Sequence, residues 1–261
     1  MKKRLLSLLL ALAFVLPLVP VFEVPLPSMP VFAAESGYYT YSVSNNKAHI
    51  EEVSTFISGD IVIPSTLDGY PVTSIDDWAF YECSSLTSIT IPSGVTSIGY
   101  GAFSNCHKLT SIIIPDGVTT IGKETFLGCW NLASITIPDS VTSIGYAAFS
   151  DCRDLEYNTY DEGKYLGNAT NPYHTLIDTT STSITAFDIH EDTKIIGYSA
   201  FSNCGSLTSI TIPDSVTSIG DAAFYWCGAL ESITIPDSVT SIGDRTFYKC
   251  SSLTTITIQT A

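Results

Sequence analysis

The stretch Leu207–Ala229, LTSITIPDSVTSIGDAAFYWCGA, contains one complete repeating unit of this chain. Its first six residues alternate apolar side chains with Thr and Ser, which predicts a short strand with Ile210 and Ile212 facing inward. Pro-Asp-Ser predicts a turn, because proline fixes φ and aspartate can bond its own backbone. A second short extended segment ends at Gly220. The following Asp-Ala-Ala-Phe predicts one helical turn, with Asp as N-cap, that directs Phe224 inward.

The unit recurs with a spacing of 23 residues, and every cysteine occupies the same place in it. The cysteines are Cys83, Cys106, Cys129, Cys152, Cys204, Cys227 and Cys250. One such unit cannot bury its own apolar face, so neighbouring units must stack, with strands about 4.8 Å apart. The sequence therefore predicts a β-rich leucine-rich-repeat solenoid over residues 61–261, with short parallel strands plus a helical turn in each coil.

The pattern L-x-x-I-x-I-P-x-x-V-x-x-I-G-x-x-A-F-x-x-C resembles the BspA-like leucine-rich repeats of bacterial surface proteins. The resemblance covers about residues 61–261 and implies a secreted or cell-surface protein. It also implies binding, since members of that family are linked to adhesion, to matrix proteins such as fibronectin and fibrinogen, and to aggregation between cells. The repeat itself does not encode the ligand.

The first 34 residues have the order of a secretory signal peptide. Three basic residues precede an apolar run over 5–16, and Val31-Phe32-Ala33-Ala34 offers small residues for cleavage. That run is too short for a transmembrane helix of about 20 residues. We therefore expect a cleaved signal peptide over 1–34, an extracellular location and no transmembrane segment in the mature chain. Residues 35–60 contain two alternating segments around Asn45-Asn46, which predict an N-terminal β-hairpin cap.

Charge and motifs exclude several functional classes. The formal net charge of −15 disfavours nucleic acid as a partner, because an acidic surface repels phosphates. The four histidines occupy unrelated positions, and no serine lies in a G-x-S-x-G setting. The sequence thus predicts a protein that is not an enzyme and has no cofactor.

The recurring polar columns have structural explanations. Export favours disulfides, but stacked cysteines would keep parallel Cβ atoms about 4.8 Å apart, whereas a disulfide needs about 3.8 Å. We expect a ladder of buried thiols and no metal site. The aspartate column at 116, 139, 214 and 237 is interpreted as turn-forming, with Ca²⁺ binding as the alternative. The threonine row at 90, 136, 211, 234 and 257 suits a half-exposed strand, with ice binding as the alternative.

The enlarged unit at 155–183 departs from the repeat, and insertions in solenoids often lie on the binding face. It predicts a β-hairpin that is either a recognition loop or an irregular repeat whose tyrosines pack on the adjacent coil. Asn168-Ala169-Thr170 also matches a glycosylation sequon. The candidate binding residues are Tyr157, Tyr160, Tyr165 and Tyr173 in this unit, and Tyr225, Trp226 and Tyr248 in later coils.

These observations predict a secreted or cell-surface binding protein that recognises a protein or glycan at the cell exterior. An adhesin for matrix proteins, host cells or other bacteria is the leading hypothesis, and a structural spacer without a defined ligand is the alternative. The sequence does not indicate the oligomeric state.

Overall fold

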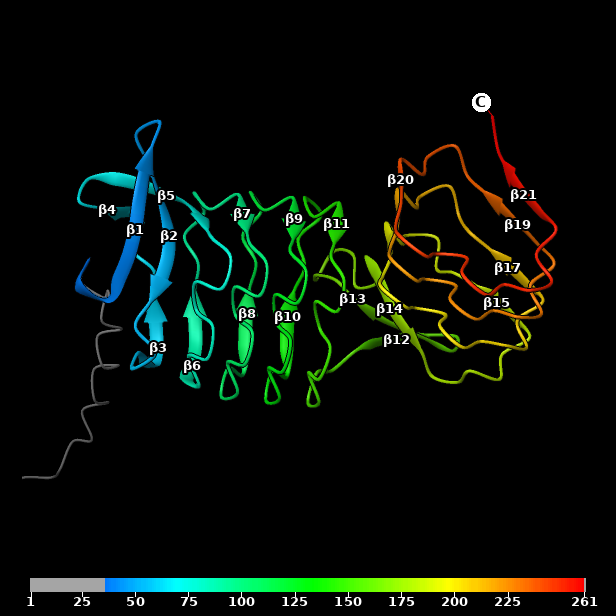
Figure 1. Ribbon diagram of the computed structural model, residues 1–261, viewed down its shortest axis with the longest axis horizontal. Coiled ribbons are helices and arrows are strands. Elements are labelled where there is room, and N and C mark those ends of the chain that lie inside the picture. Colours follow the sequence, from blue (N-terminus) through cyan, green and yellow to red (C-terminus); the bar gives the residue numbers. More distant parts are fainter. Residues whose placement is uncertain (1–35, 261) are drawn as a thin grey trace, which may run out of the picture. The chain divides into compact units, whose positions relative to one another are not determined.

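The computed structural model describes residues 36–260. The predicted signal peptide, residues 1–34, lies outside the described residues. The described chain winds into successive coils, which Figure 1 colours from blue to red. Each regular coil has three sides: a first strand side, a second strand side and a turn side between the glycine and the cysteine of the repeat.

The first strand side is formed by the strand that precedes each repeat proline. Equivalent strands pair in parallel and in register, so that Ile89, Ile112 and Ile135 align. This side contains one sheet of β3 (Ser58–Val62), β6 (Ser85–Thr90), β8 (Ser111–Ile113) and β10 (Ser134–Thr136), then the pairs β15 (Ala186–Asp188) with β17 (Ser209–Thr211) and β19 (Ser232–Ile235) with β21 (Thr255–Ile258). Inward isoleucines of the earlier strands, such as Ile89 and Ile112, fill the core as predicted, whereas Ile256 and Ile258 of β21 are exposed.

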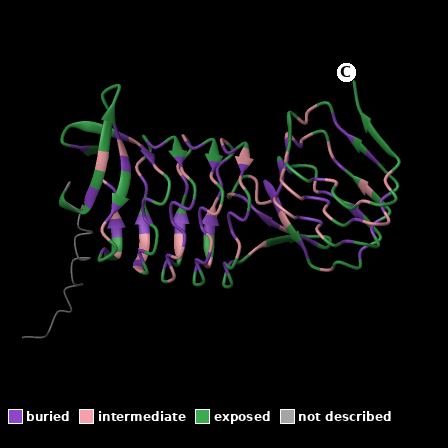
Figure 2. Cartoon of the chain, viewed as in Figure 1, coloured by how far each residue is buried: buried purple, intermediate pink, exposed green. Residues whose placement is uncertain are grey.

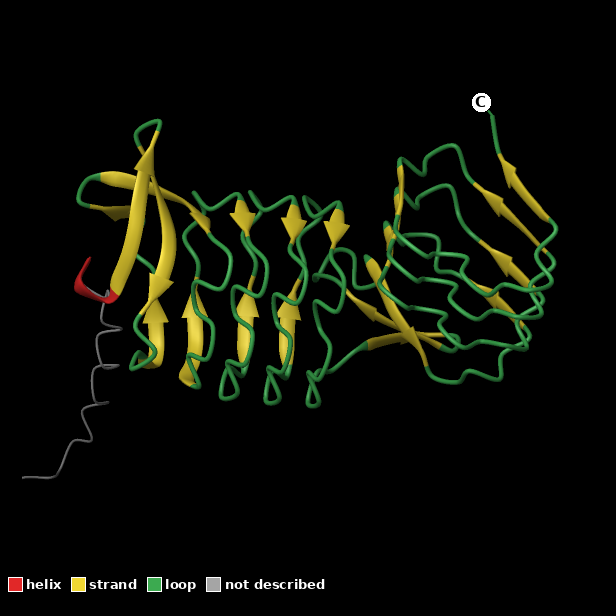
Figure 3. Ribbon diagram, in the orientation of Figure 1, coloured by secondary structure: helices red, strands yellow, loops and turns green. Residues whose placement is uncertain are grey.

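The second strand side is formed by short strands that end just before the repeat glycine. It contains β5 (Tyr70–Ile75), β7 (Ser97–Ile98), β9 (Thr120–Ile121) and β11 (Ser143–Ile144), then β14 (Thr175–Thr179), β16 (Ile195–Ile196), β18 (Ser218–Ile219) and β20 (Ser241–Ile242). The two groups belong to different sheets, and the change occurs at the enlarged unit (Figure 3).

The N-terminal segment adds a hairpin to the second strand side. After a short 3₁₀ turn η1 (Ser36–Tyr38), β1 (Tyr39–Ser44) pairs antiparallel with β2 (Lys47–Val53). Asn45 and Asn46 both have positive φ, as a type I′ turn requires. β2 then pairs in parallel with β5, while β4 (Thr66–Leu67) and β5 form a second small hairpin. Ala48 and Ile50 of β2 are fully buried.

The turn side differs from the helical turn that the sequence predicted. Among residues 36–260 the only helical element is η1, and the glycine-to-cysteine segment consists of consecutive β-turns. Every turn places a residue in the left-handed region, for example Trp78 and Glu82. Because φ changes sign along the segment, alternate N–H groups point at the next coil. The segment therefore forms backbone hydrogen bonds between coils, whereas a helix would form them within the segment.

The core consists of columns of identical side chains, and Figure 2 colours the residues that supply them as buried segments of the successive coils. The phenylalanines stack ring on ring, with centroids 5.0 Å apart between Phe80 and Phe103 and 5.1 Å apart between Phe201 and Phe224. The buried residues form two clusters that meet at the enlarged unit. Leu166 and Ile195, although beyond the first group of coils, pack into the first cluster.

All seven cysteines are free thiols, in agreement with the spacing argument. The structure adds their role: the Sγ of Cys106 donates to the carbonyl of Phe80 in the preceding coil at 3.2 Å, and Cys129 donates likewise to Phe103 at 3.1 Å. Burial raises the pKa of the Cys152 thiol to about 12. This thiol therefore stays protonated, and the buried thiols of the column serve as small internal hydrogen-bond donors.

The repeat glycine is required by close approach of successive coils. A Cβ atom on Gly122 would lie 2.7 Å from the carbonyl carbon of Gly99, and one on Gly145 would lie 2.6 Å from the amide nitrogen of Lys123. These distances are far below van der Waals contact. The glycine therefore leaves room for the backbone of the neighbouring coil.

The enlarged unit forms a three-stranded antiparallel sheet of β12 (Asn158–Tyr160), β13 (Gly163–Leu166) and β14, confirming a hairpin over 155–183. Asn168 fastens its loop to the first group of coils, because its Nδ2 donates to the carbonyl of Ile137 at 3.0 Å and to Asp139 Oδ1 at 2.8 Å. Asn171 fastens the same loop to the second group through the carbonyl of Asp192. A glycan on the Asn168 sequon would replace these contacts.

Candidate binding surface

The turn side carries most of the exposed aromatic side chains of the described coils. The repeat fixes only the inward Phe and Cys of this segment, so the intervening positions are free to present large outward side chains. The exposed rings on this side are Trp78, Tyr81, Tyr100, Tyr146, Trp226 and Tyr248, and Trp130 lies directly after the cysteine of its coil. Because each coil repeats the same backbone, these rings come to lie on one side of the solenoid although they are far apart in sequence.

The earliest coils present one group of contacting rings. Trp78 lies edge-on to Tyr81 and Tyr100, with centroid distances of 5.2 Å and 4.4 Å. A Cβ atom on Gly101 would meet the Trp78 ring at 2.3 Å, so the glycine leaves space for the indole. The hydroxyl of Tyr100 donates to Glu124 in the next coil, which raises the pKa of that tyrosine. The group is therefore held in place before any ligand arrives.

A second group contains the predicted residues Tyr225, Trp226 and Tyr248, which the structure brings together. Tyr225 and Tyr248 stack with centroids 5.3 Å apart, and Lys249 lies 5.5 Å from the Tyr248 ring centroid. Trp226 and Tyr248 are each about half exposed. This pairing of flat rings with a cation is typical of protein recognition surfaces.

Between these groups, sequence reasoning missed a stacked trio. His107, Trp130 and Arg153 follow the cysteine in three successive coils, and the His107 and Trp130 rings lie 4.0 Å apart. The Arg153 guanidinium lies 5.2 Å from the Trp130 centroid. The signal was available in the sequence as the common position after each cysteine.

The tyrosines predicted in the enlarged unit are largely built into the fold. Tyr165 is completely buried, and its hydroxyl accepts from the His190 amide, so it is unavailable to a ligand in this structure. Tyr173 stacks on His190 at 3.9 Å. Tyr157 is partly buried against the first core cluster, and burial raises its pKa to about 12. Only Tyr160 of the four is exposed. This arrangement corresponds to the irregular-repeat interpretation of the unit.

The first strand side offers a flatter and more polar surface. Thr90 and Thr136 align with Ile113, which is 69% exposed, and a hollow of about 510 Å³ lies beside this row in the early coils. Asp139 of the aspartate column bonds Asn168, which is a structural contact.

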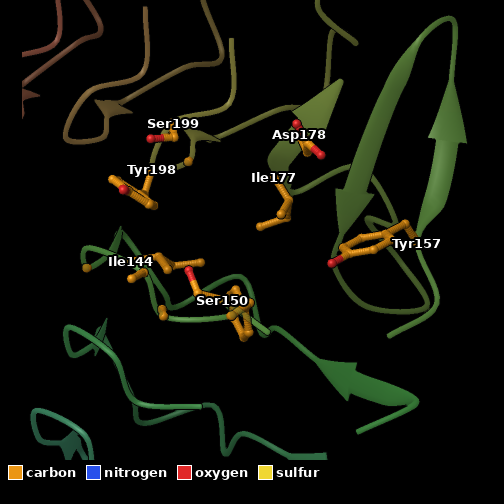
Figure 4. A pocket seen from close by; sticks show the side chains of 12 residues that line it. Ile144, Ser150, Tyr157, Ile177, Asp178, Tyr198 and Ser199 are labelled. Atoms are coloured by element: carbon orange, nitrogen blue, oxygen red, sulfur yellow. The ribbon is translucent and has the colours of Figure 1, made fainter. Parts of the chain in front are cut away.

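A pocket of about 220 Å³ lies where the two groups of coils meet (Figure 4). We call it the junction slot. One wall consists of Ile144 at the end of β11 and the turn segment that contains Phe149 and Ser150. The opposite wall contains Ile177, Tyr198 and Ser199. The Tyr146 and Tyr198 rings, 4.5 Å apart, lie beside it on the aromatic turn side, where a wider hollow of about 440 Å³ continues past Tyr198.

Within residues 36–260, no group of three or more His, Cys, Asp or Glu side chains is placed to hold one metal ion. Burial raises the pKa values of groups such as Cys83 and Tyr39, whereas a side-chain hydrogen bond is the first cause of the raised pKa of exposed tyrosines such as Tyr100. The groups exposed on the turn side are mainly aromatic rings and hydroxyls.

A family model for the BspA type leucine rich repeat region matches six copies over residues 59–171 and 179–261. The chain belongs to the BspA-type leucine-rich repeat family. The model describes a repeat region and names no reaction. The gap between the matched ranges, 172–178, lies in the enlarged unit, which is where the structure departs from the regular coil.

One solved structure supports the same fold for this BspA-type chain, and two others are similar to it in sequence. A leucine-rich repeat protein of T. pallidum, TpLRR, is 24% identical with a TM-score of 0.50, over 84% of this chain and 89% of that chain. One from Bacteroides ovatus is 28% identical with a TM-score of 0.47, over 85% and 75%. The leucine rich cell surface protein of Faecalibacterium prausnitzii is 24% identical with a TM-score of 0.33, over 86% and 94%. No curated protein matches the chain significantly.

None of the helices described in residues 36–260 has the length and apolar character needed to cross a bilayer.

Proposed function

We propose that this BspA-type repeat protein is exported to the cell surface or beyond and binds a protein ligand there through its aromatic turn side. The observation that carries the proposal is the gathering of exposed rings on one side of the coils, where Trp226 and Tyr248 are each about half exposed. Tyr and Trp contribute strongly to binding energy at protein interfaces, because they bury a large area at little entropic cost.

Rigidity supports this proposal. The turn segments are tied to one another by backbone bonds such as Phe103 N–H to the Thr125 carbonyl at 2.9 Å, and the rings rest on neighbouring rings. A surface that is ordered before binding loses less conformational entropy when the ligand arrives. The formal net charge of −15 favours a partner with a neutral or basic surface and disfavours nucleic acid, whose phosphates it would repel.

An adhesive role for matrix proteins such as fibronectin or fibrinogen is the specific form of the proposal. It rests on the signal-like order of residues 1–34 and on the family resemblance. The proposal includes a non-enzymatic role, because the repeat family names no reaction and the surface described above offers contacts for binding.

The test is binding of the purified protein to immobilised fibronectin, fibrinogen and cell-wall glycans. We expect saturable binding to a protein ligand that weakens about tenfold or more in a Trp226→Ala, Tyr248→Ala double variant. Tyr160→Ala, also an exposed ring but on β12, is the matched control and should bind as the parent does. Absence of binding to every ligand would favour the structural spacer, and equal loss in both variants would remove the turn side from the proposal.

A further inference from the structure

The junction slot exists because one coil lacks its turn side. In regular coils the chain turns at the glycine and reaches the next leading leucine ten positions later, as from Gly122 to Leu132. In the enlarged unit, Leu176 accepts from the Gly197 amide, which is the bond that Ile75 makes with Gly99. Ile177 therefore stands in the glycine position, and Ile184 follows only seven positions later. β14 continues straight to Thr179, paired with β13, and no turn segment is formed.

The wall that precedes the gap presents unused backbone donors. In the regular coils, the amides of one turn segment donate to carbonyls of the next: Glu124 to Tyr146, Phe126 to Ala148 and Gly128 to Ser150, all at 2.8–2.9 Å. The corresponding donors one coil later belong to Ala147, Phe149 and Asp151. Among the described residues, none of these three amides has a hydrogen-bond acceptor.

The wall that follows the gap presents the matching acceptors. Its turn segment donates onward in the regular way, from Ser199, Phe201 and Asn203 to carbonyls of the next coil. The carbonyls that would receive bonds from a preceding coil are those of Tyr198, Ala200 and Ser202. No donor within residues 36–260 reaches these three oxygens. The two walls thus carry the two halves of a backbone ladder whose middle strand is missing.

The apolar floor of the slot is also incomplete. Phe149 is 9% exposed and Ile144 is 7% exposed, whereas Phe126 and Ile121 at the same places in the preceding coil are fully buried. Phe149 stacks on Phe126, and no aromatic ring within the described residues contacts its other face. An occupant of the slot would therefore gain a site for one apolar or aromatic side chain.

We propose that the junction slot binds a polypeptide segment of a partner protein, which takes the place of the missing turn segment. A polypeptide main chain can present N–H groups along one edge and C=O groups along the other, which is what the two walls require. Sugar hydroxyls do not offer that alternation. The segment bonds the three donors and three acceptors and inserts an apolar side chain against Ile144, Phe149 and Ile177.

This inference deepens the proposed function, since it names main-chain recognition at a slot that opens beside the aromatic turn side. It is separable from that function, because the slot and the Trp226–Tyr248 group are different parts of the surface. A ligand could use the rings alone, and the experiment below distinguishes the two cases.

The probe is a labelled peptide of the chain's own turn segment, Gly220–Gly228, with blocked ends and Cys227→Ser, titrated against the full protein by fluorescence anisotropy. We expect saturable binding to the parent protein. Ser150→Tyr should strengthen it about threefold or more, because its ring would stack on Tyr225 of the peptide as Tyr248 stacks on Tyr225 in the protein, with centroids 5.3 Å apart. Tyrosine is tolerated at this place of the repeat, as Tyr225 and Tyr248 show. Leu127→Tyr, the same place one coil earlier, is the matched control and should bind within about twofold of the parent.

Two further readouts test the main-chain mechanism. Hydrogen exchange at Ala147, Phe149 and Asp151 should be fast in the free protein and should slow when the peptide is added. A peptide with esters in place of the amide bonds of Ala222 and Phe224 lacks two donors and should bind at least about tenfold more weakly. The inference is overturned if the peptide does not bind, if Ser150→Tyr does not raise its affinity, or if a cell-wall glycan fragment protects these amides and the peptide does not.

Discussion

The turn-side backbone amides are hydrogen-bonded between regular coils but have no acceptor among the described residues where a coil faces the enlarged unit. In a regular coil that is followed by another, alternate turn-side donors, such as the Phe103 amide, meet carbonyls of the next coil, and the phenylalanine is covered by the next ring. At the enlarged unit, β14 replaces the turn with a straight strand, and the donors and the ring of the preceding coil are left facing a pocket. A solenoid coil is thus completed by its neighbour, and losing one neighbour creates a potential binding site.

The largest difference should appear when the stacked rings are truncated. Phe126→Ala, between Phe103 and Phe149, should lower the free energy of unfolding by about 3–5 kcal/mol, because it leaves a cavity in a close-packed column. Phe149→Ala should cost clearly less, since one face of that ring already borders the slot. Urea unfolding followed by circular dichroism measures both, and equal costs would contradict the contrast drawn between the two regions.

Glycine substitutions should give the next largest contrast. Gly122→Ala places a Cβ within 3 Å of three backbone atoms, and we expect a cost of about 1–3 kcal/mol from overpacking. Gly197→Ala meets only the Leu176 carbonyl at 2.7 Å and should cost less. Gly228→Ala, with a single contact at 3.7 Å, is the control. Thermal unfolding should rank the three losses of stability in that order. A larger loss for Gly197→Ala than for Gly122→Ala would contradict the close-approach explanation.

Much of this fold could be predicted because the same residue pattern recurs every 23 residues along the chain. The columns of Leu, Ile, Phe and Cys identified the core and the family, and the change of period at 155–183 located the irregular unit. The helical turn was wrong, because Ala-Phe propensities are local, whereas the turn segment is shaped by bonds such as Phe126 N–H to the Ala148 carbonyl in another coil.

The candidate site was harder to predict, for a related reason. Sequence marks aromatic residues but not which of them face inward, so Tyr165 and Tyr160 looked alike although one is buried and the other exposed. The slot corresponds to no sequence motif. It lies between the turn segments 147–151 and 198–202, and each of them lacks an adjacent turn segment on the side that faces the slot.

The loop that joins the two groups of coils should have a moderate energetic role. Asn168→Ala removes the donors to Ile137 and Asp139 and the acceptor for Thr170 and Asn171, for an expected loss of about 1–3 kcal/mol. Because the loop couples two core clusters, we also expect the urea transition to broaden towards two steps. Thr142→Ala, which loses one exposed bond, is the control and should keep a single sharp transition.

The smallest contrast concerns the thiols. Cys129→Ala should cost roughly 1 kcal/mol through loss of the bond to the Phe103 carbonyl. Cys204→Ala should cost less, because its partner is Thr179 Oγ1 at 3.7 Å in place of a carbonyl. Burial raises the pKa of Cys152 from 9.0 to about 12, so the unfolded chain ionises first and stability should fall as pH rises from about 9 to 12. Chemical unfolding at pH 7.5 and pH 10 checks that sign.

The direction of the turn-side bonds has a consequence for how such a chain can change length. Each coil offers donors to the coil after it and acceptors to the coil before it, as Phe103 and Ala102 illustrate. That contact is head-to-tail, so it does not close on itself and sets no fixed number of members. Duplication of a 23-codon stretch within the regular coils would give a new coil that both neighbours already fit. The enlarged unit does not share this property, because a second copy of it would not fit the contacts that it makes with its two neighbouring coils.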